Sequence, residues 1–177
     1  MSFLRDLALA HQMHEGWYPG SKSFRNNNPG NLRGAFGVFI HFPTYGVGLA
    51  ALEGDLKAKI SGVAPSIQRY MKNSGKSYSQ LVMIDYVSIY APSADFNSPV
   101  SYCDDLCNHL NQYNIKPSTP LSQLNDLIDG TIDRIPDTDY IMPIQFKIQA
   151  AQNALRWATP MRARMLLRLI ARLKQLV

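Results

Sequence analysis

Apolar residues recur at helical spacing through most of this sequence, and this periodicity restricts the fold more than any other feature. The spacing of three and four residues that buries one face of a helix is found at about residues 2–15, 46–60, 65–73, 77–90, 98–113 and 121–128. Ser2, Ser77 with Gln80, and Ser98 before Pro99 are typical of helix starts. We therefore expect a mainly α-helical protein.

The helical pattern is interrupted once over a long stretch, from Trp17 to Thr44. Pro19-Gly20, Asn28-Pro29-Gly30 and the glycines from Gly34 to Gly37 are turn signals. Residues 37–42 are rich in Val, Ile and Phe, which favours a short strand. The predicted fold class is thus α+β, with a helical domain, a small β-hairpin region beside a cleft and a C-terminal helical appendage.

The composition changes after residue 120, and we expect three parts: a domain over 1–120, a linker or short helical segment over 121–142, and an appendage over 143–177. Seven basic residues and no acidic one follow Asp139, so the basic character lies in this tail. Its last helix would carry leucines on one side and Arg164, Arg168 and Arg172 on another. Such a helix could pack on its own domain, dock on a partner or virion protein, or lie on an anionic membrane or nucleic acid; no specific nucleic-acid binding is expected.

The sequence shows neither a secretory signal nor an apolar run of the roughly 20 residues that span a bilayer. We expect synthesis in the cytoplasm. The two cysteines, Cys103 and Cys107, share a predicted helix face and are interpreted as buried free thiols rather than metal ligands. No metal and no cofactor are predicted.

Glu15 stands at the end of the first predicted helix, where Leu7 and His11 lead to it at intervals of four residues. Gly16 would end the helix directly after it. A carboxyl group against apolar side chains suits a general acid, and the only other glutamate is Glu53. The alternative is an exposed carboxylate without a role.

Several linked motifs resemble a known family. They are Glu15-Gly16, residues 25–33 (Arg-Asn-Asn-Asn-Pro-Gly-Asn-Leu-Arg), Phe42-Pro43-Thr44-Tyr45 with Gly48, and Tyr90-Ala91-Pro92 followed by Asn97, Ser98 and Tyr102. Over roughly residues 7–121 the chain is similar to phage and bacterial peptidoglycan-cleaving proteins of the lysozyme-like superfamily, described as virion structural lysins or lytic transglycosylases. It departs from that pattern at residues 95–98.

The resemblance implies that Glu15 is the catalytic acid for cleavage of the β-1,4 bond between MurNAc and GlcNAc. One convincing carboxylate favours a lytic transglycosylase; a hydrolase would use a second, from Glu53, Asp55 or Asp95. A non-catalytic wall-binding or virion structural protein is a further alternative. Without a signal, the protein would reach the wall in a virion or after release.

The partner implied by the resemblance is the glycan strand of peptidoglycan. The side chains expected to bind it are Asn28, Asn31, Tyr45, Tyr90 and Asn97. Two alternatives remain open at this point. The segment from Asn28 to Asn31 could be a structural turn whose side chains bond to its own backbone, and Tyr90 could belong to the core.

Overall fold

A computed structural model of the chain describes residues 2–92, 98–135, 167 and 170–171. The chain divides into two compact units, Met1–Asp137 and Thr138–Val177, and the following account concerns the first. Its α-helices are α1 (Phe3–His14), α2 (Lys22–Arg25), α3 (Tyr45–Ile60), α4 (Pro65–Ser74), α5 (Met83–Tyr90), α6 (Pro99–His109) and α7 (Leu121–Ile128). The prediction of a mainly helical protein is confirmed.

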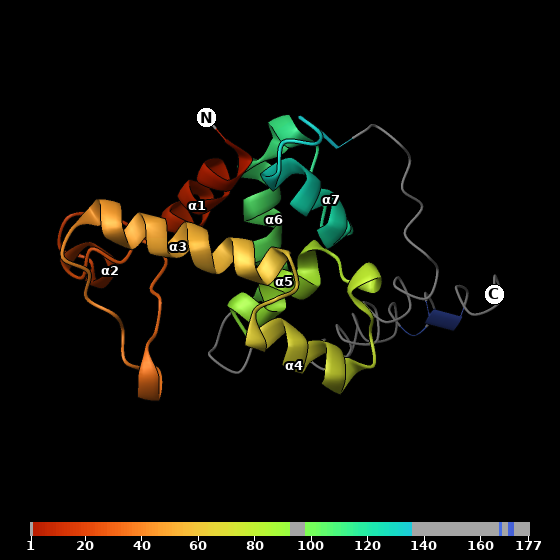
Figure 1. The fold of residues 1–177 in the computed structure, drawn as a ribbon, viewed down its shortest axis with the longest axis horizontal. Helices are drawn as coiled ribbons and strands as arrows, with labels where there is room; N and C mark the ends of the chain where they lie inside the picture. Colours follow the sequence, from red (N-terminus) through yellow and green to blue (C-terminus); the bar gives the residue numbers. More distant parts are fainter. Residues whose placement is uncertain (1, 93–97, 136–166, 168–169, 172–177) are drawn as a thin grey trace. The chain divides into compact units, whose positions relative to one another are not determined.

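The core lies between α1 and the helices packed around it. Helix α1 contacts α3, α6 and α7, while α5 lies against α4 and α6; α3 crosses α1 in Figure 1. The predicted inward face of α3 is confirmed, since Leu49, Leu52, Leu56 and Ile60 are all buried. The segment predicted around Leu121 to Ile128 is α7, and its buried leucines belong to this same core.

Four of these helices follow a residue whose hydroxyl group accepts a hydrogen bond from the backbone three residues on, Ser21 at α2 among them. Ser2 does so at α1, Thr44 at α3 and Ser98 at α6. These bonds satisfy N–H groups that have no partner inside the helix. The predicted starts at Ser2 and Ser98 are therefore correct.

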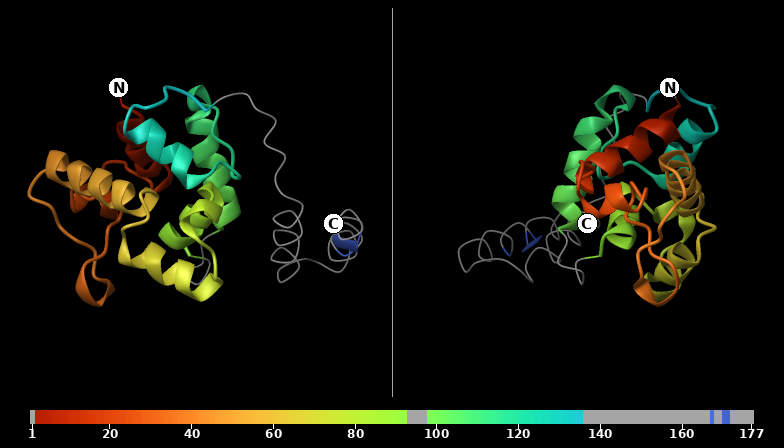
Figure 2. Two further views of the ribbon diagram at one scale, coloured as in Figure 1. Left: turned by 45° about the vertical axis from the view of Figure 1, so that its right-hand side comes forward. Right: turned by 90° about the vertical axis from the view of Figure 1, so that its left-hand side faces the viewer.

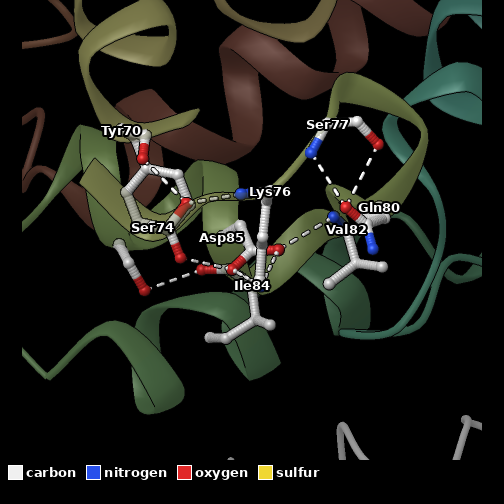
Figure 3. Close-up of polar contacts among 9 residues, drawn as sticks. Tyr70, Ser74, Lys76, Ser77, Gln80, Val82, Ile84 and Asp85 are labelled. Carbon is white, nitrogen blue, oxygen red and sulfur yellow. Dashed lines mark hydrogen bonds and ion pairs between the residues drawn. The ribbon is translucent and has the colours of Figure 1, made fainter. Parts of the chain in front are cut away.

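The predicted start at Ser77 needs correction. Ser77 and Gln80 do form a capping box, but on the short turn η2 (Tyr78–Gln80). Helix α5 begins only at Met83, because the backbone of residues 81–84 first pairs with residues 117–121. There the buried carboxylate of Asp85 accepts a hydrogen bond from Val82 N at 3.1 Å. Figure 3 shows Asp85 between Tyr70 and Lys76, which approach its Oδ1 atom to 2.6 and 2.7 Å.

The predicted β-hairpin is also corrected. Within the described part of the chain there is no β-strand, and residues 37–42 contribute only an isolated bridge from Phe39 to Arg33. The backbone of this segment pairs instead with the asparagine-rich loop: Phe42 N donates to Asn26 O, and Ile40 N donates to Leu32 O, both at 2.9 Å. Figures 1 and 2 show the loop between α2 and α3 extending away from the helices to a tip at η1 (Ala35–Gly37).

The two helical segments expected in the tail, with Arg164, Arg168 and Arg172, lie outside the described residues apart from three helical positions at 167, 170 and 171. Among the residues that are described, no helix combines the length and apolar character needed to cross a lipid bilayer.

Candidate functional site around Glu15

Glu15 lies at the carboxyl end of α1, where the helix meets the irregular loop. Its backbone N–H still bonds to His11 O at 2.9 Å, as in a continuing helix. Gly16 then adopts a left-handed backbone with φ of 71°, which glycine adopts without steric cost and which ends the helix. The half-buried side chain of Glu15 therefore extends from the fixed end of the helix, on the face that carries the buried Leu7 and His11.

Both carboxyl oxygens of Glu15 accept hydrogen bonds from neutral side chains. Tyr102 in α6 donates its hydroxyl group to Oε1 at 3.0 Å, and Asn31 in the loop donates Nδ2 to Oε2 at 2.8 Å. The sequence predicted apolar walls around this group, but the immediate partners are polar. Three separate segments of the chain thus meet at one carboxyl group and fix its orientation.

Asn31 is held in place by a close contact between the loop and two helices. The hydroxyl group of Tyr90 donates to Gly30 O at 2.8 Å. A Cβ atom at Gly30 would collide with the side chain of Leu52 and lie 2.9 Å from the Tyr90 hydroxyl oxygen. Asn31 itself has a left-handed φ of 48°, a conformation that asparagine tolerates better than most residues. The loop is therefore shaped to present this amide to Glu15.

The side chain of Asn28 differs from that of Asn31 in its burial and in its hydrogen-bond partners. Its side chain is fully buried and bonds only to backbone: Nδ2 donates to Leu32 O at 2.8 Å and Ile40 O at 2.9 Å, and Oδ1 accepts from Leu32 N at 2.8 Å. All of these bonds close the loop on itself. Of the two interpretations of this segment, the geometry favours a structural role for Asn28.

An aromatic group flanks the helix end. The ring of Trp17 lies 5.0 Å from that of Tyr45 and 5.2 Å from that of Phe24. The hydroxyl group of Tyr45 donates to Gln12 Oε1 at 2.7 Å, which ties the start of α3 to α1. Flat apolar rings beside a carboxyl group are the surfaces on which sugar rings stack in carbohydrate sites. Tyr45 thus packs beside Trp17 and is bonded to α1, while Asn97 lies outside the described residues.

The other candidate carboxylates have partners of their own. Glu53 pairs with Arg5 at 2.8 Å. Asp55 accepts hydrogen bonds from Lys59 through both oxygens. Asp95 lies outside the described residues. Neither Glu53 nor Asp55 contacts Glu15, so within the described part of the chain the site is organised around a single carboxyl group.

His11 and Tyr86 are linked to Glu15 through Tyr102, although no role was predicted for them. His11 is completely buried one turn before Glu15; its Nδ1 lies 2.7 Å from the Tyr102 hydroxyl and its Nε2 lies 2.6 Å from that of Tyr86. Burial lowers the pKa of His11 to about 3, because the charged form loses its hydration. The signal was present in the spacing, since His11 precedes Glu15 by four residues on one helix face.

The cysteines take no part in this site. Cys103 is a buried free thiol and Cys107 is half-buried; a hydrogen bond with Cys107 and burial raise the pKa of Cys103. The described residues include no group of three or more histidine, cysteine and acidic side chains placed to hold a metal ion.

No protein-family model, no curated protein sequence and no solved structure matches the chain.

Proposed function

We propose that this protein cleaves the β-1,4 bond between MurNAc and GlcNAc in peptidoglycan, as a lytic transglycosylase of lysozyme-like type with Glu15 as its catalytic acid. The observation that carries the proposal is the placement of Glu15. This glutamate lies at the end of a core helix and is held by hydrogen-bond donors from two other segments. It belongs to the Glu15-Gly16 motif, which resembles that of peptidoglycan-cleaving proteins. Orientation of the acid toward one position is what protonation of a leaving oxygen requires.

The reaction needs one group that first gives and then takes a proton. Glu15 in its acid form protonates the glycosidic oxygen while the bond from that oxygen to the anomeric carbon of MurNAc breaks. The 6-hydroxyl oxygen of the same MurNAc then bonds to the anomeric carbon, and its proton passes to the Glu15 carboxylate. The products are an anhydro sugar end and a free hydroxyl on GlcNAc, and the enzyme returns to its starting state.

The presence of one suitably placed carboxylate supports the transglycosylase over the hydrolase. A hydrolase generally uses a second carboxylate for the oxocarbenium-like centre or for a water molecule. Glu53 and Asp55 are engaged by Arg5 and Lys59. In the transglycosylase reaction the substrate supplies its own N-acetyl group and its own nucleophile, so no second carboxylate is needed.

The charge of the loop suits the proposed substrate. Between Gly16 and Leu52 the sequence contains Lys22, Arg25 and Arg33 but no acidic residue. Peptidoglycan carries carboxylates on its peptide stems, and cations beside the site attract such groups over several ångströms. Trp17 and Tyr45 would offer flat faces to the sugar rings.

Clearing of purified peptidoglycan by the full-length protein tests the proposal. Glu15→Gln keeps the shape of the side chain but removes its acid, and we expect a loss of at least about 100-fold. Glu53→Gln is the matched control, because it changes the only other glutamate and removes only a surface ion pair of small energy. Equal clearing by the Glu15 variant would contradict the role of the acid, and no clearing by the unaltered protein would favour a non-catalytic wall-binding protein.

A further inference from the structure

A chain of hydrogen bonds leads from the protein core to Glu15. It begins at the hydroxyl group of Tyr86, which lies 2.6 Å from His11 Nε2. It continues from His11 Nδ1 over 2.7 Å to the hydroxyl oxygen of Tyr102, and from there over 3.0 Å to Glu15 Oε1. Tyr86 and His11 are fully buried and Tyr102 is 3% exposed, so solvent does not compete for these bonds.

The buried end of the chain determines the direction of every bond in it. Among the residues that the structure describes, the Tyr86 hydroxyl group has no hydrogen-bond acceptor other than His11 Nε2. A buried hydroxyl proton without an acceptor is costly, so Tyr86 donates and Nε2 is the unprotonated nitrogen. The single ring proton of a neutral histidine then sits on Nδ1.

The same reasoning continues outward to the carboxyl group. Because His11 Nδ1–H donates to the Tyr102 oxygen, the Tyr102 proton is directed to its other neighbour, Glu15 Oε1. A proton on Oε1 would point toward the Tyr102 hydroxyl group, which already donates its own proton to Oε1. Oε1 is therefore suited only to accept a hydrogen bond, in the carboxylate and in the acid alike.

We propose that His11 is a positioning residue that acts through Tyr102 to keep Glu15 Oε1 as a permanent acceptor, so that Oε2 carries the proton transferred in catalysis. The role of the proton rests on the proposed function, whereas the direction of the bonds does not. A buried histidine that touches no substrate thus selects the reactive oxygen.

The surroundings of Oε2 fit this division. Asn31 Nδ2 donates to Oε2 at 2.8 Å, while Asn31 Oδ1 is buried without a hydrogen-bond partner among the described residues. An unsatisfied buried oxygen calls for an explanation. Rotation of the amide by half a turn would bring Oδ1 to Oε2, where it could accept the proton of the acid form. Asn31 can therefore form a hydrogen bond with Oε2 whether or not Oε2 carries a proton. Tyr102, in contrast, can only donate a hydrogen bond to Oε1.

Other titratable groups surround this chain and contribute to its field. They are His14 on α1, Asp55 and Lys59 on α3, Tyr90 on α5, and Cys103 and Asp105 on α6. His14 contacts Asp105 at 3.0 Å and Lys59 pairs with Asp55, so each of these two carboxylates has a partner of its own. Variants that test the chain of hydrogen bonds should therefore keep these residues unchanged.

The tautomer of His11 is the direct test. Nitrogen NMR of the full-length protein, labelled at its imidazole nitrogens, distinguishes protonated from unprotonated ring nitrogens, and a His11→Gln spectrum identifies the His11 signals. We expect a neutral ring with its proton on Nδ1 from pH 5 to 8. A proton on Nε2, or a charged ring, would overturn the proposal. Because no substrate is involved, this result is independent of whether the protein cleaves peptidoglycan.

A pair of tyrosine variants tests the link to catalysis. Tyr86→Phe removes the group that sets the direction of the chain, so Tyr102 can then donate to His11 and accept a proton from Oε1. The acid form gains a new bond, and the pH at which half of the maximal clearing rate is reached should rise by about one unit. Tyr70→Phe is the control, because it removes a phenol that donates to Asp85 at 2.6 Å (Figure 3). Identical pH profiles for the two variants would contradict a positioning role.

Discussion

The side-chain amide of Asn31 donates a hydrogen bond of 2.8 Å to the carboxyl group of Glu15, 16 residues earlier in the chain. This bond joins the end of helix α1 to a loop without regular structure. The loop is in turn held by Tyr90, which donates to the neighbouring Gly30 O at 2.8 Å. The orientation of Glu15 therefore depends on contacts from the loop, in addition to the helix on which it is carried.

Substitution of Asn31 separates its contribution to activity from its contribution to stability. Asn31→Ala and Asn31→Gly both remove the amide that donates to Glu15. Because a hydrogen bond to a charged group contributes a substantial free energy, each variant should lower the clearing rate by about 10- to 100-fold. Thermal unfolding should differ between them by about 1 kcal/mol in favour of glycine, because alanine is strained at the left-handed φ of 48°. Full activity in the glycine variant would contradict the role of the amide.

The helices were largely predictable from the sequence, because each has one apolar face of regular spacing. Helices α1, α3, α4 and α6 lie where this pattern places them. The start of α5 was not predictable, since Ser77 and Gln80 form their expected capping box around a different, shorter turn. The backbone of residues 81–84 is held by residues 117–121, and such pairing between distant segments leaves no local signal.

The expected hairpin was wrong for a related reason. Val, Ile and Phe between residues 37 and 42 favour a strand locally, but the side chains of Asn27 and Asn28 bond to the backbone carbonyls of Phe42 and Ile40. These side-chain bonds hold the segment against the asparagine-rich loop, and the backbone pairing of residues 32–34 with 38–40 does not extend into a ladder. A pattern of turn residues indicates a loop, yet it does not specify which backbone groups the asparagine side chains will reach.

For the candidate site, Glu15 and Asn31 were predicted from the sequence, and the structure brings them into contact, but its buried half was not predicted. His11 and Tyr86 have the spacing of ordinary core residues, so the four-residue interval between His11 and Glu15 does not by itself distinguish a site residue. The hydrogen bonds that link α1, α5 and α6 do. Asn28 shows the converse: its sequence environment matches that of Asn31, but its side chain closes the loop.

The close contact between α3 and the loop leads us to a further prediction about the free energy of unfolding. A Cβ atom at Gly48 would collide with the backbone oxygen of Asn27, whereas one at Gly54 in the same helix meets nothing within 4 Å. Gly48→Ala should lower the free energy of unfolding by several kcal/mol, on the order of other strongly disruptive substitutions. Gly54→Ala should raise it by about 0.5–1 kcal/mol through helix propensity. Urea unfolding of the two variants checks this, and equal effects would contradict the close approach of the loop.

Burial of His11 makes stability depend on pH. The pKa of His11 is lowered to about 3 in the folded protein, against about 6.5 in an unfolded chain. Between these values the unfolded state binds a proton that the folded state does not, so stability falls as the pH drops through this interval, by up to about 1.4 kcal/mol per pH unit. Above about pH 6.5 this contribution is complete.

Urea unfolding between pH 4 and 7 measures this dependence. His11→Gln should lose less stability on acidification than the unaltered protein, because it lacks the buried titrating ring. His109→Gln, at an exposed position near the end of α6, should retain the original slope. If the His11 variant and the unaltered protein had the same slope, the histidine would not be held neutral by the fold.

Mass spectrometry of the products released from purified peptidoglycan tests the central claim most directly. Digestion by the full-length protein should yield fragments with anhydro-MurNAc ends, and Glu15→Gln should yield none under the same conditions while Glu53→Gln still does. Fragments that carry only reducing ends would show that water, and not the 6-hydroxyl group, adds to the anomeric carbon, and would contradict the transglycosylase mechanism. Release of the same fragments by the Glu15 variant would contradict the assignment of Glu15 as the catalytic acid.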